Sequence, residues 1–209
     1  MIRLLIADDH PVIRRGLKEI LSEQSGMEVV AEASNAAEVL EQVRKHKLDV
    51  VLLDITMPGR SGIDALRDIK HEYPKLPVLM LSIHPEDQYA VRVLKNGASG
   101  YLTKESAPEE LVNAIHKVVA GGRYVSASLA ERLAVEIGGD STKEPHELLS
   151  DREYEVLVQI GKGKPVSQIA DEMSLSVKTV STYRTRILEK LGLENTADLI
   201  RYAIERNLE

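Results

Sequence analysis

Four short apolar runs constrain the fold of this chain most, because each leads into a residue with a charged or hydroxyl side chain. Apolar runs of this length, bounded by turn residues, are typical of buried parallel strands. The runs and the residues that follow them are Leu4–Ala7 with Asp8 and Asp9, Val50–Leu53 with Asp54, Val78–Leu81 with Ser82, and Tyr101–Leu102 with Lys104. In an open α/β sheet the ligand crevice lies outside the carboxyl ends of the strands. The sequence therefore predicts three carboxylates, one hydroxyl and one ammonium group at the same rim of a sheet.

Strands and helices alternate along the chain as far as about Ala120. The expected strands are Arg3–Ala7, Glu28–Ala33, Val50–Leu53, Val78–Ser82 and Gly100–Leu102. The expected helices, with apolar residues at helical spacing, are Val12–Ser22, Ala37–Lys45, Ile63–His71, Gln88–Lys95 and Glu109–Ala120. Alternating strand and helix units of this length predict an α/β domain, with a parallel sheet and helices on both of its faces.

The rest of the chain lacks this alternation. A further helix is expected over Ala127–Ile137, and the breakers and lack of apolar residues in Gly138–Pro145 are typical of a linker. Four helices are then expected, at Asp151–Ile160, Val166–Met173, Val177–Leu191 and Ala197–Asn207. A short helix, a tight turn and a longer polar helix are typical of a helix-turn-helix. We therefore divide the chain into an α/β domain (1–122), a linker with a helix and a flexible tether (123–146), and an all-α domain (147–209).

Composition excludes several classes of function. The chain has no Cys, which excludes disulfides, thiol catalysis and zinc sites with Cys ligands. No apolar stretch approaches the roughly 20 residues of a membrane span, and Leu4–Ala7 is too short for the core of a signal peptide. A cytoplasmic protein without membrane contact is expected. The net charge of −6 argues against a generally nucleic-acid-binding surface, so any DNA-binding surface is expected to be one local helix.

The acids expected at the rim are suited to binding a cation and to reacting with a phosphoryl group. Asp8, Asp9 and Asp54 would repel one another at neutral pH unless a hard cation neutralised them. Mg²⁺ suits such a site, because it binds one or two carboxylates together with water and phosphate oxygens. A carboxylate can also attack phosphorus and form an acyl phosphate. The ammonium group of Lys104 would balance the charge, and Ser82 could donate a hydrogen bond to a phosphoryl oxygen.

The first domain resembles a response-regulator receiver domain over about Met1–Gly122, in the motifs LLIADDHPVIRRGL, DVVLLDITMPGRSGIDAL, VLMLS and GASGYLTKES. The resemblance implies a flavodoxin-like, doubly wound sheet of five parallel strands in the order 2-1-3-4-5. It also implies a role for each site residue: Asp54 as the phospho-acceptor, Asp8 and Asp9 as the acidic metal pair, the backbone carbonyl of Thr56 as a further Mg²⁺ ligand, Lys104 as the partner of the phosphoryl group, and Ser82 and Tyr101 as a switch pair. Glu105 is a departure, because many receivers have proline after the lysine.

The segment LSDREYEVLVQIGKGKPVSQIADEMSLSVKTVSTYRTRILEKLGLENTADLIRYAI resembles a LuxR-type DNA-binding domain. With the receiver, the whole chain resembles the NarL/FixJ family of transcription factors. The resemblance implies two sets of DNA contacts: Ser181, Thr182 and Thr185 facing bases, and Lys178, Thr179, Tyr183 and Arg186 near phosphates. It implies pairing through the last helix, Ala197–Asn207. Arg184 departs from the apolar residue that is common at its position. The residues of the same helix also predict an apolar stripe of Val177, Val180, Ile187, Leu188 and Leu191.

The favoured function is that of a two-component response regulator. Asp54 is expected to accept a phosphoryl group from a sensor histidine kinase with Mg²⁺, which gates homodimerisation and binding to double-stranded promoter DNA. RNA polymerase is a further candidate partner. The chain is not expected to be an enzyme, apart from self-phosphorylation and slow autodephosphorylation at Asp54.

Other classes of protein remain in competition with this one. A haloacid-dehalogenase-like phosphatase would have an aspartate two residues after the nucleophile, where this chain has Thr56. A scaffold that only binds proteins is disfavoured by the full acidic set and by Lys104. RNA binding is disfavoured because Trp and Phe, the usual platforms for stacked bases, are absent.

Single residues of the site also have simpler interpretations. Asp8 and Asp9 alone could complement the dipole of the first helix. Lys104 alone could be a surface lysine, and Tyr101 alone a packing residue. No metal-ligand spacing links His10 to His84, so solvated or packing roles are expected for both, with His84 as a candidate modulator of water access.

Overall fold

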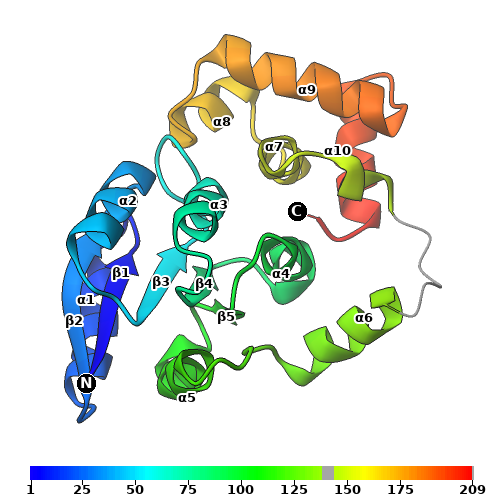
Figure 1. The fold of residues 1–209 in the computed structure, drawn as a ribbon. Helices are drawn as coiled ribbons and strands as arrows, with labels where there is room; N and C mark the ends of the chain where they lie inside the picture. Colours follow the sequence, from blue (N-terminus) through cyan, green and yellow to red (C-terminus); the bar gives the residue numbers. More distant parts are fainter. Residues whose placement is uncertain (138–143, 209) are drawn as a thin grey trace. The chain divides into compact units, whose positions relative to one another are not determined.

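The structure is a computed structural model, and it describes residues 1–137 and 144–208 of the 209-residue chain. The chain divides into two compact units, Met1–Gly139 and Asp140–Glu209, which are described separately (Figure 1). Within the expected linker segment Gly138–Pro145, residues 138–143 lie outside the described residues. The last residue of that linker, Pro145, begins a short 3₁₀ helix.

The first unit is built on a parallel five-stranded sheet with the strand order β2-β1-β3-β4-β5. The strands are β1 (Ile2–Ala7), β2 (Met27–Ala33), β3 (Val50–Asp54), β4 (Val78–Ser82) and β5 (Gly100–Thr103). β3 and β4 are buried along their whole length, which is why they consist of unbroken apolar runs in the sequence. The predicted doubly wound α/β topology is confirmed.

Helices cover both faces of this sheet (Figure 1). They are α1 (Pro11–Ser22), α2 (Ala36–Lys45), α3 (Gly62–Glu72), α4 (Glu86–Lys95) and α5 (Ala107–Val119); a further helix, α6 (Ala127–Ile137), follows them and does not lie on the sheet. α1 and α5 share one apolar cluster with alternate strand residues such as Leu4, Leu52 and Leu81, while α2, α3 and α4 lie on the other face. α4 begins two residues earlier than expected, directly after Pro85, since proline is tolerated where a helix starts.

The chain that follows α5 stays packed on the first unit. The backbone N–H of Tyr101 donates to the carbonyl of Tyr124 at 3.2 Å, and the N–H of Tyr124 donates to Ser99 at 2.9 Å. These bonds extend the edge of the sheet beyond β5. α6 then contacts α4, and Leu129 is buried there. Residues 123–137, which the sequence analysis assigned to a linker, therefore belong to the first compact unit.

The second unit is helical throughout its described residues. Its elements are η1 (Pro145–Leu148), α7 (Asp151–Gly161), α8 (Val166–Glu172), α9 (Val177–Leu191) and α10 (Thr196–Glu205). Ser150 and Glu153 form the expected capping box at the start of α7. α9 ends at Gly192, whose φ of 66° lies in the left-handed region that glycine adopts readily. The predicted four-helix, all-α unit is confirmed.

Neither unit contains a membrane-crossing candidate, because no helix in the described part of the chain combines the necessary length and apolar character.

Candidate functional site

The register of the sheet brings the predicted site residues to one rim. Ala7 of β1 pairs with Leu53 of β3, so Asp8 and Asp54 follow at the same level on neighbouring strands. Asp54 pairs with Leu81 of β4, and Ser82 of β4 pairs with Thr103 of β5. The carboxyl ends of four strands thus form one continuous edge, as the apolar runs predicted.

Lys104 joins two of the acids at this rim. Its Nζ lies 2.6 Å from Oδ2 of Asp8 and 2.7 Å from Oδ2 of Asp54. Both carboxylates are buried, and the lysine side chain is only 9% exposed. Its backbone N–H donates to the carbonyl of Ser82 at 2.7 Å, and all described peptide bonds, including the one before Glu105, are trans. The ammonium group is therefore held between the two carboxylates.

Burial changes the acidity of these groups. Burial raises the pKa of Asp54 to about 6, and the nearby Asp8 carboxylate adds to this, although Lys104 and the backbone N–H of Thr56 oppose it. Burial pulls the pKa of Lys104 down, but the attraction of Asp54 and Asp8 outweighs it, so that pKa is raised. One ammonium group therefore does not offset the cost of keeping the acids ionised.

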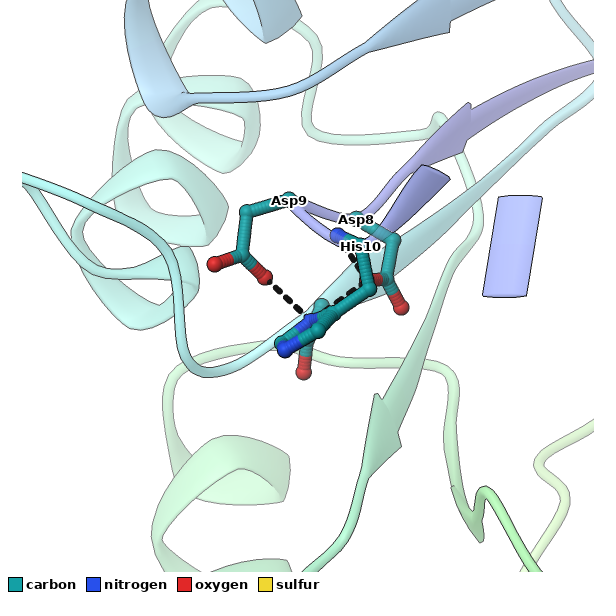
Figure 2. Close-up of side chains that lie close together, drawn as sticks. Asp8, Asp9 and His10 are labelled. Carbon is teal, nitrogen blue, oxygen red and sulfur yellow. Dashed lines mark hydrogen bonds and ion pairs between the residues drawn. The ribbon is translucent and has the colours of Figure 1, made fainter. Parts of the chain in front are cut away.

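Asp9 and His10 complete the acidic rim. Oδ1 of Asp9 lies 2.8 Å from Nδ1 of His10, and Oδ1 of Asp8 lies 3.3 Å from the same nitrogen (Figure 2). The backbone N–H of His10 also donates to Oδ1 of Asp8 at 2.8 Å. We expected only a solvated or packing role for His10. Its contacts with the acids were not predicted, because they depend on a turn directly after the strand that brings the side chains of adjacent residues toward one another.

The donor set fits a divalent cation. One ligand atom from each of Asp8, Asp9, His10 and Asp54 lies within 4.8 Å of the others. Oδ2 of Asp8 and Oδ1 of Asp9 are buried atoms without an aligned hydrogen-bond donor in the described structure; Lys104 and His10 make charge contacts with them. Carboxylate oxygens in this state suit a hard cation. The N–H of Thr56 donates to Oδ1 of Asp54 at 3.3 Å, so Thr56 lies beside the acids.

Ser82 and Tyr101 meet at the backbone of His84. Oγ of Ser82 accepts a hydrogen bond from the N–H of His84 at 3.0 Å, and the hydroxyl of Tyr101 donates to the carbonyl of His84 at 2.8 Å. All three residues are buried. The imidazole of His84 packs against Tyr89, with 4.9 Å between the ring centres. A movement of the Ser82 hydroxyl toward the rim would therefore break its hydrogen bond with the N–H of His84. Tyr101 is bonded to the carbonyl of the same residue, so the change would reach Tyr101 as well.

Gly62 shows how closely the chain packs behind Asp54. A Cβ atom at this position would lie 1.8 Å from the backbone carbonyl oxygen of Asp54. The N–H of Gly62 donates to the carbonyl of Ile55 at 2.8 Å, which holds the start of α3 against the end of β3. Only glycine fits here without moving the backbone of the strand that carries Asp54.

α9 carries the predicted DNA contacts on its accessible side. Lys178, Thr182, Thr185 and Arg186 are exposed, and Thr179, Ser181 and Tyr183 are partly exposed. Val180 and Ile187 are buried and anchor the helix, whereas Val177 is 52% exposed and does not join the expected apolar stripe. Val177 is the first residue of α9, where the helix has not yet turned it toward the core.

α9 is also fixed to the rest of the second unit by charge. Nζ of Lys190 lies 2.6 Å from Oε2 of Glu153, the capping residue of α7. Arg184, the expected departure from the apolar pattern, is partly buried, and its Nε makes no hydrogen bond to the described residues. Val180, Ile187 and the ion pair of Lys190 thus help to hold the helix, and its polar face stays accessible.

The chain matches two known protein families. Residues 4–116 match the response regulator receiver domain, and residues 147–203 match the luxR family of bacterial regulatory proteins. The response regulator UvrY of Escherichia coli (strain K12) is 37% identical over 209 residues, covering 100% of this chain and 96% of that protein. The oxygen regulatory protein NreC of Staphylococcus aureus (strain MRSA252) is 39% identical over 213 residues, covering 99% and 98%.

Solved structures show the same architecture. RcsB from Salmonella enterica serovar Typhimurium, bound to promoter rprA in the presence of the phosphomimetic BeF₃⁻, aligns with a TM-score of 0.65 at 28% identity over 97% of this chain and 98% of that one. A LuxR-family two-component response regulator from Aurantimonas sp. SI85-9A1 aligns with a TM-score of 0.60 at 38% identity, covering 64% of this chain and 96% of that one.

A parallel sheet with an acidic rim, followed by a LuxR-type helical unit, defines the class of response regulators. Within this class the chain belongs to the NarL/FixJ family. It is therefore a regulator of transcription with a receiver domain and a DNA-binding domain, and proteins of this kind are transcription factors rather than enzymes.

Proposed function

We propose that Asp54 accepts a phosphoryl group from a sensor histidine kinase and that this modification controls binding to promoter DNA. The observation that carries the proposal is the position of the Asp54 carboxylate, 2.7 Å from the ammonium group of Lys104 and beside a second buried acid. A carboxylate placed in this way can act as a nucleophile while neighbouring charges stabilise the phosphoryl oxygens.

The transfer is a displacement at phosphorus. An oxygen of Asp54 forms a bond to phosphorus as the bond to the kinase imidazole nitrogen breaks, and the departing imidazole keeps the bonding electrons and later takes up a proton. Asp8, Asp9, Asp54 and the backbone carbonyl of Thr56 would hold Mg²⁺, which supplies neutralisation of the phosphoryl oxygens. Reversal of the modification is slow attack by water on the same acyl phosphate.

Lys104 has two partners in turn. Before transfer its ammonium group contacts Asp8 and Asp54. After transfer it binds a phosphoryl oxygen, since the new group carries more charge than the carboxylate it replaces. The lysine therefore stabilises the product more than the starting state, which is the condition for favouring phosphorylation.

Ser82 and Tyr101 transmit the change. The hydroxyl of Ser82 donates to a phosphoryl oxygen, and His84 then loses the acceptor of its backbone N–H. Tyr101 follows into the space that Ser82 leaves, and the surface of α4, β5 and α5 changes shape. This surface, or the face of α1 and α5, pairs two copies of the receiver or releases the DNA-binding unit.

α9 reads the DNA. Ser181, Thr182 and Thr185 face base edges in the major groove, and Lys178, Thr179, Tyr183 and Arg186 contact phosphates or sugars. Support comes from the exposure of this face and from RcsB structures bound to promoter DNA. α10 pairs the DNA-binding units of a homodimer, and RNA polymerase is the candidate partner at the promoter. These roles imply a cytoplasmic protein. We propose a receiver domain at 1–122 and a DNA-binding domain at 147–209, connected by residues 123–146, of which 123–137 pack on the first unit.

Labelling with acetyl phosphate and Mg²⁺, followed by peptide mass spectrometry, tests the proposal. We expect one phosphoryl group on the peptide that contains Asp54, and none after Asp54→Asn. Asp68→Asn, a change of a partly exposed acid on α3, serves as the matched control and should leave labelling intact. Labelling of another residue would refute the assignment, and no labelling at all would favour a scaffold that only binds proteins.

A further inference from the structure

We propose that His10 is a nitrogen ligand of the divalent cation at the acidic rim, and that it shifts the preference of the site from Mg²⁺ toward first-row transition cations such as Mn²⁺. The inference rests on the proposed cation site formed by Asp8, Asp9 and Asp54. It adds a fourth side-chain ligand and a metal preference that carboxylates alone would not provide.

The ring of His10 faces the acids through Nδ1. This nitrogen lies 2.8 Å from Oδ1 of Asp9 and 3.3 Å from Oδ1 of Asp8 (Figure 2). One ligand atom from each of these residues and from Asp54 lies within 4.8 Å of the other three. Ligands on opposite sides of a cation, with bonds of about 2.1 Å, are about 4.2 Å apart. Small closing movements therefore bring the four atoms to coordination distance.

The backbone holds His10 in this position. Its N–H donates to Oδ1 of Asp8 at 2.8 Å, and Nη1 of Arg14 donates to the backbone carbonyl of Asp8 at 2.6 Å. Asp8 itself has no exposed surface. The turn that carries the imidazole is thus hydrogen-bonded to the most deeply buried acid of the site. The imidazole is therefore positioned beside the cation site before the cation binds.

Helix capping does not account for the histidine. His10 is the N-cap residue of α1, where Ser, Thr, Asp and Asn are preferred because their side chains bond to the first N–H groups of the helix. The side chain of His10 makes no such bond. Its polar side-chain contacts in the described structure are made with Asp8 and Asp9 instead.

Two of the acidic oxygens have charged neighbours but no aligned hydrogen-bond donor among the described residues. They are the buried Oδ2 of Asp8 and Oδ1 of Asp9, which make charge contacts with Lys104 and His10, respectively. A cation meets both oxygens at once. Nδ1 of His10 then presents its lone pair, and the ring proton lies on Nε2. The side chain is 63% exposed, so water can fill the remaining coordination positions.

The mixture of oxygen and nitrogen ligands determines which cation binds most tightly. Mg²⁺ prefers oxygen ligands and keeps several waters, so an imidazole contributes little to its binding. Imidazole suits first-row transition cations, while carboxylates and water also suit Mn²⁺. Three carboxylates and one imidazole therefore favour Mn²⁺ and its heavier neighbours over Mg²⁺, and removal of the imidazole should reduce that preference.

Electron paramagnetic resonance of the full chain loaded with Mn²⁺ tests the inference. The chain has six histidines, so variants must identify the source of any nitrogen signal. We expect the coupling of one directly bonded imidazole nitrogen, lost in His10→Ala and retained in His116→Ala, an exposed histidine on α5. We also expect His10→Ala to weaken Mn²⁺ binding about tenfold, with Mg²⁺ binding, measured by competition, changed less than about twofold.

Two results would overturn the inference, and they separate it from the proposed function. If Mn²⁺ binds in a way that needs Asp9 and Asp54 but shows no directly bonded nitrogen, or if His10→Ala weakens both cations equally, His10 is not a ligand and the acidic site stands. If Asp9→Asn and Asp54→Asn leave Mn²⁺ binding unchanged, the proposed cation site fails as well.

Discussion

Lys104 contacts Asp54 at 2.7 Å, although fifty residues separate them in the sequence. The same ammonium group lies 2.6 Å from Asp8, so one side chain contacts two buried carboxylates on neighbouring strands and offsets part of the cost of their burial. The contact explains how an acidic cluster can persist in the interior of the rim. It also makes the stability of the receiver depend on the group that the proposed chemistry uses.

Lys104→Ala should therefore destabilise the receiver. Removing one partner of a buried ion pair costs about 3–5 kcal/mol, because the remaining charges stay buried. Mg²⁺ should restore part of the loss, since it can neutralise the same carboxylates. Denaturant unfolding with and without Mg²⁺ measures both effects. Lys45→Ala, a change at the exposed end of α2, should cost less than about 0.5 kcal/mol; equal losses for the two variants would contradict the account.

Asp54→Asn should have the opposite effect when no divalent cation is present. The pKa of Asp54 is raised to about 6 in the folded protein, from an ordinary value of 3.8. Between these values the unfolded chain has already lost the proton that the folded chain retains, so stability falls as the pH rises. At neutral pH the variant should be more stable by about 3 kcal/mol, since one pKa unit corresponds to about 1.4 kcal/mol.

The free energy of unfolding, measured from pH 4 to pH 7 in the presence of a chelator, tests the predicted direction of this pH dependence. The wild type should lose stability across that interval relative to Asp54→Asn, and the difference should be constant above pH 7. If Asp54→Asn is less stable than the wild type at neutral pH, the ionised, buried carboxylate of Asp54 does not destabilise the folded protein, and the account is wrong on this point. Addition of Mg²⁺ should then stabilise the wild type more than the variant.

Tyr101→Phe should separate phosphorylation from its consequence. The variant removes the hydroxyl that donates to the carbonyl of His84, at a cost of about 1 kcal/mol in stability. Labelling of Asp54 by acetyl phosphate should persist, while the gain in DNA affinity on phosphorylation should fall. Tyr73→Phe, a change of a partly exposed tyrosine, is the control. An undiminished gain in Tyr101→Phe would exclude Tyr101 from the switch.

Gly62→Ala should be one of the more damaging small changes in the receiver. The added methyl group would lie 1.8 Å from the carbonyl oxygen of Asp54, and overpacking of this kind costs about 1–3 kcal/mol. Gly16→Ala on α1 is the matched control, because its methyl group meets no atom within 4 Å. It should stabilise the protein by about 0.5–1 kcal/mol, the usual gain of alanine over glycine in a helix. Thermal melts compare the two, and similar effects would contradict the packing argument.

The parallel strands could be predicted from the sequence because burial on both faces makes them continuous apolar runs. The gathering of Asp8, Asp54 and Lys104 followed from the rule that strand ends share one rim. Side-chain pattern and topology therefore sufficed for the acidic site.

Features that depend on the backbone were not predictable in this way. The bonds from Tyr124 to the edge of β5 use only main-chain groups, which leave no side-chain pattern. Gly100 was the one available signal, because a Cβ there would lie 2.6 Å from the carbonyl oxygen of Tyr124. The link between Ser82 and Tyr101 also runs through the backbone of His84. The contact of His10 with the acids depends on the turn after β1, which spacing alone does not define.

The most direct test of the account is the affinity of the full chain for double-stranded DNA before and after treatment with acetyl phosphate and Mg²⁺. The DNA is a fragment selected from random sequences, and fluorescence anisotropy measures binding at fixed salt. We predict a gain of about tenfold for the wild type, within the usual range of coupling between two sites, and no gain for Asp54→Asn. Equal affinities for phosphorylated wild type and Asp54→Asn would contradict the claim that phosphorylation of Asp54 controls DNA binding.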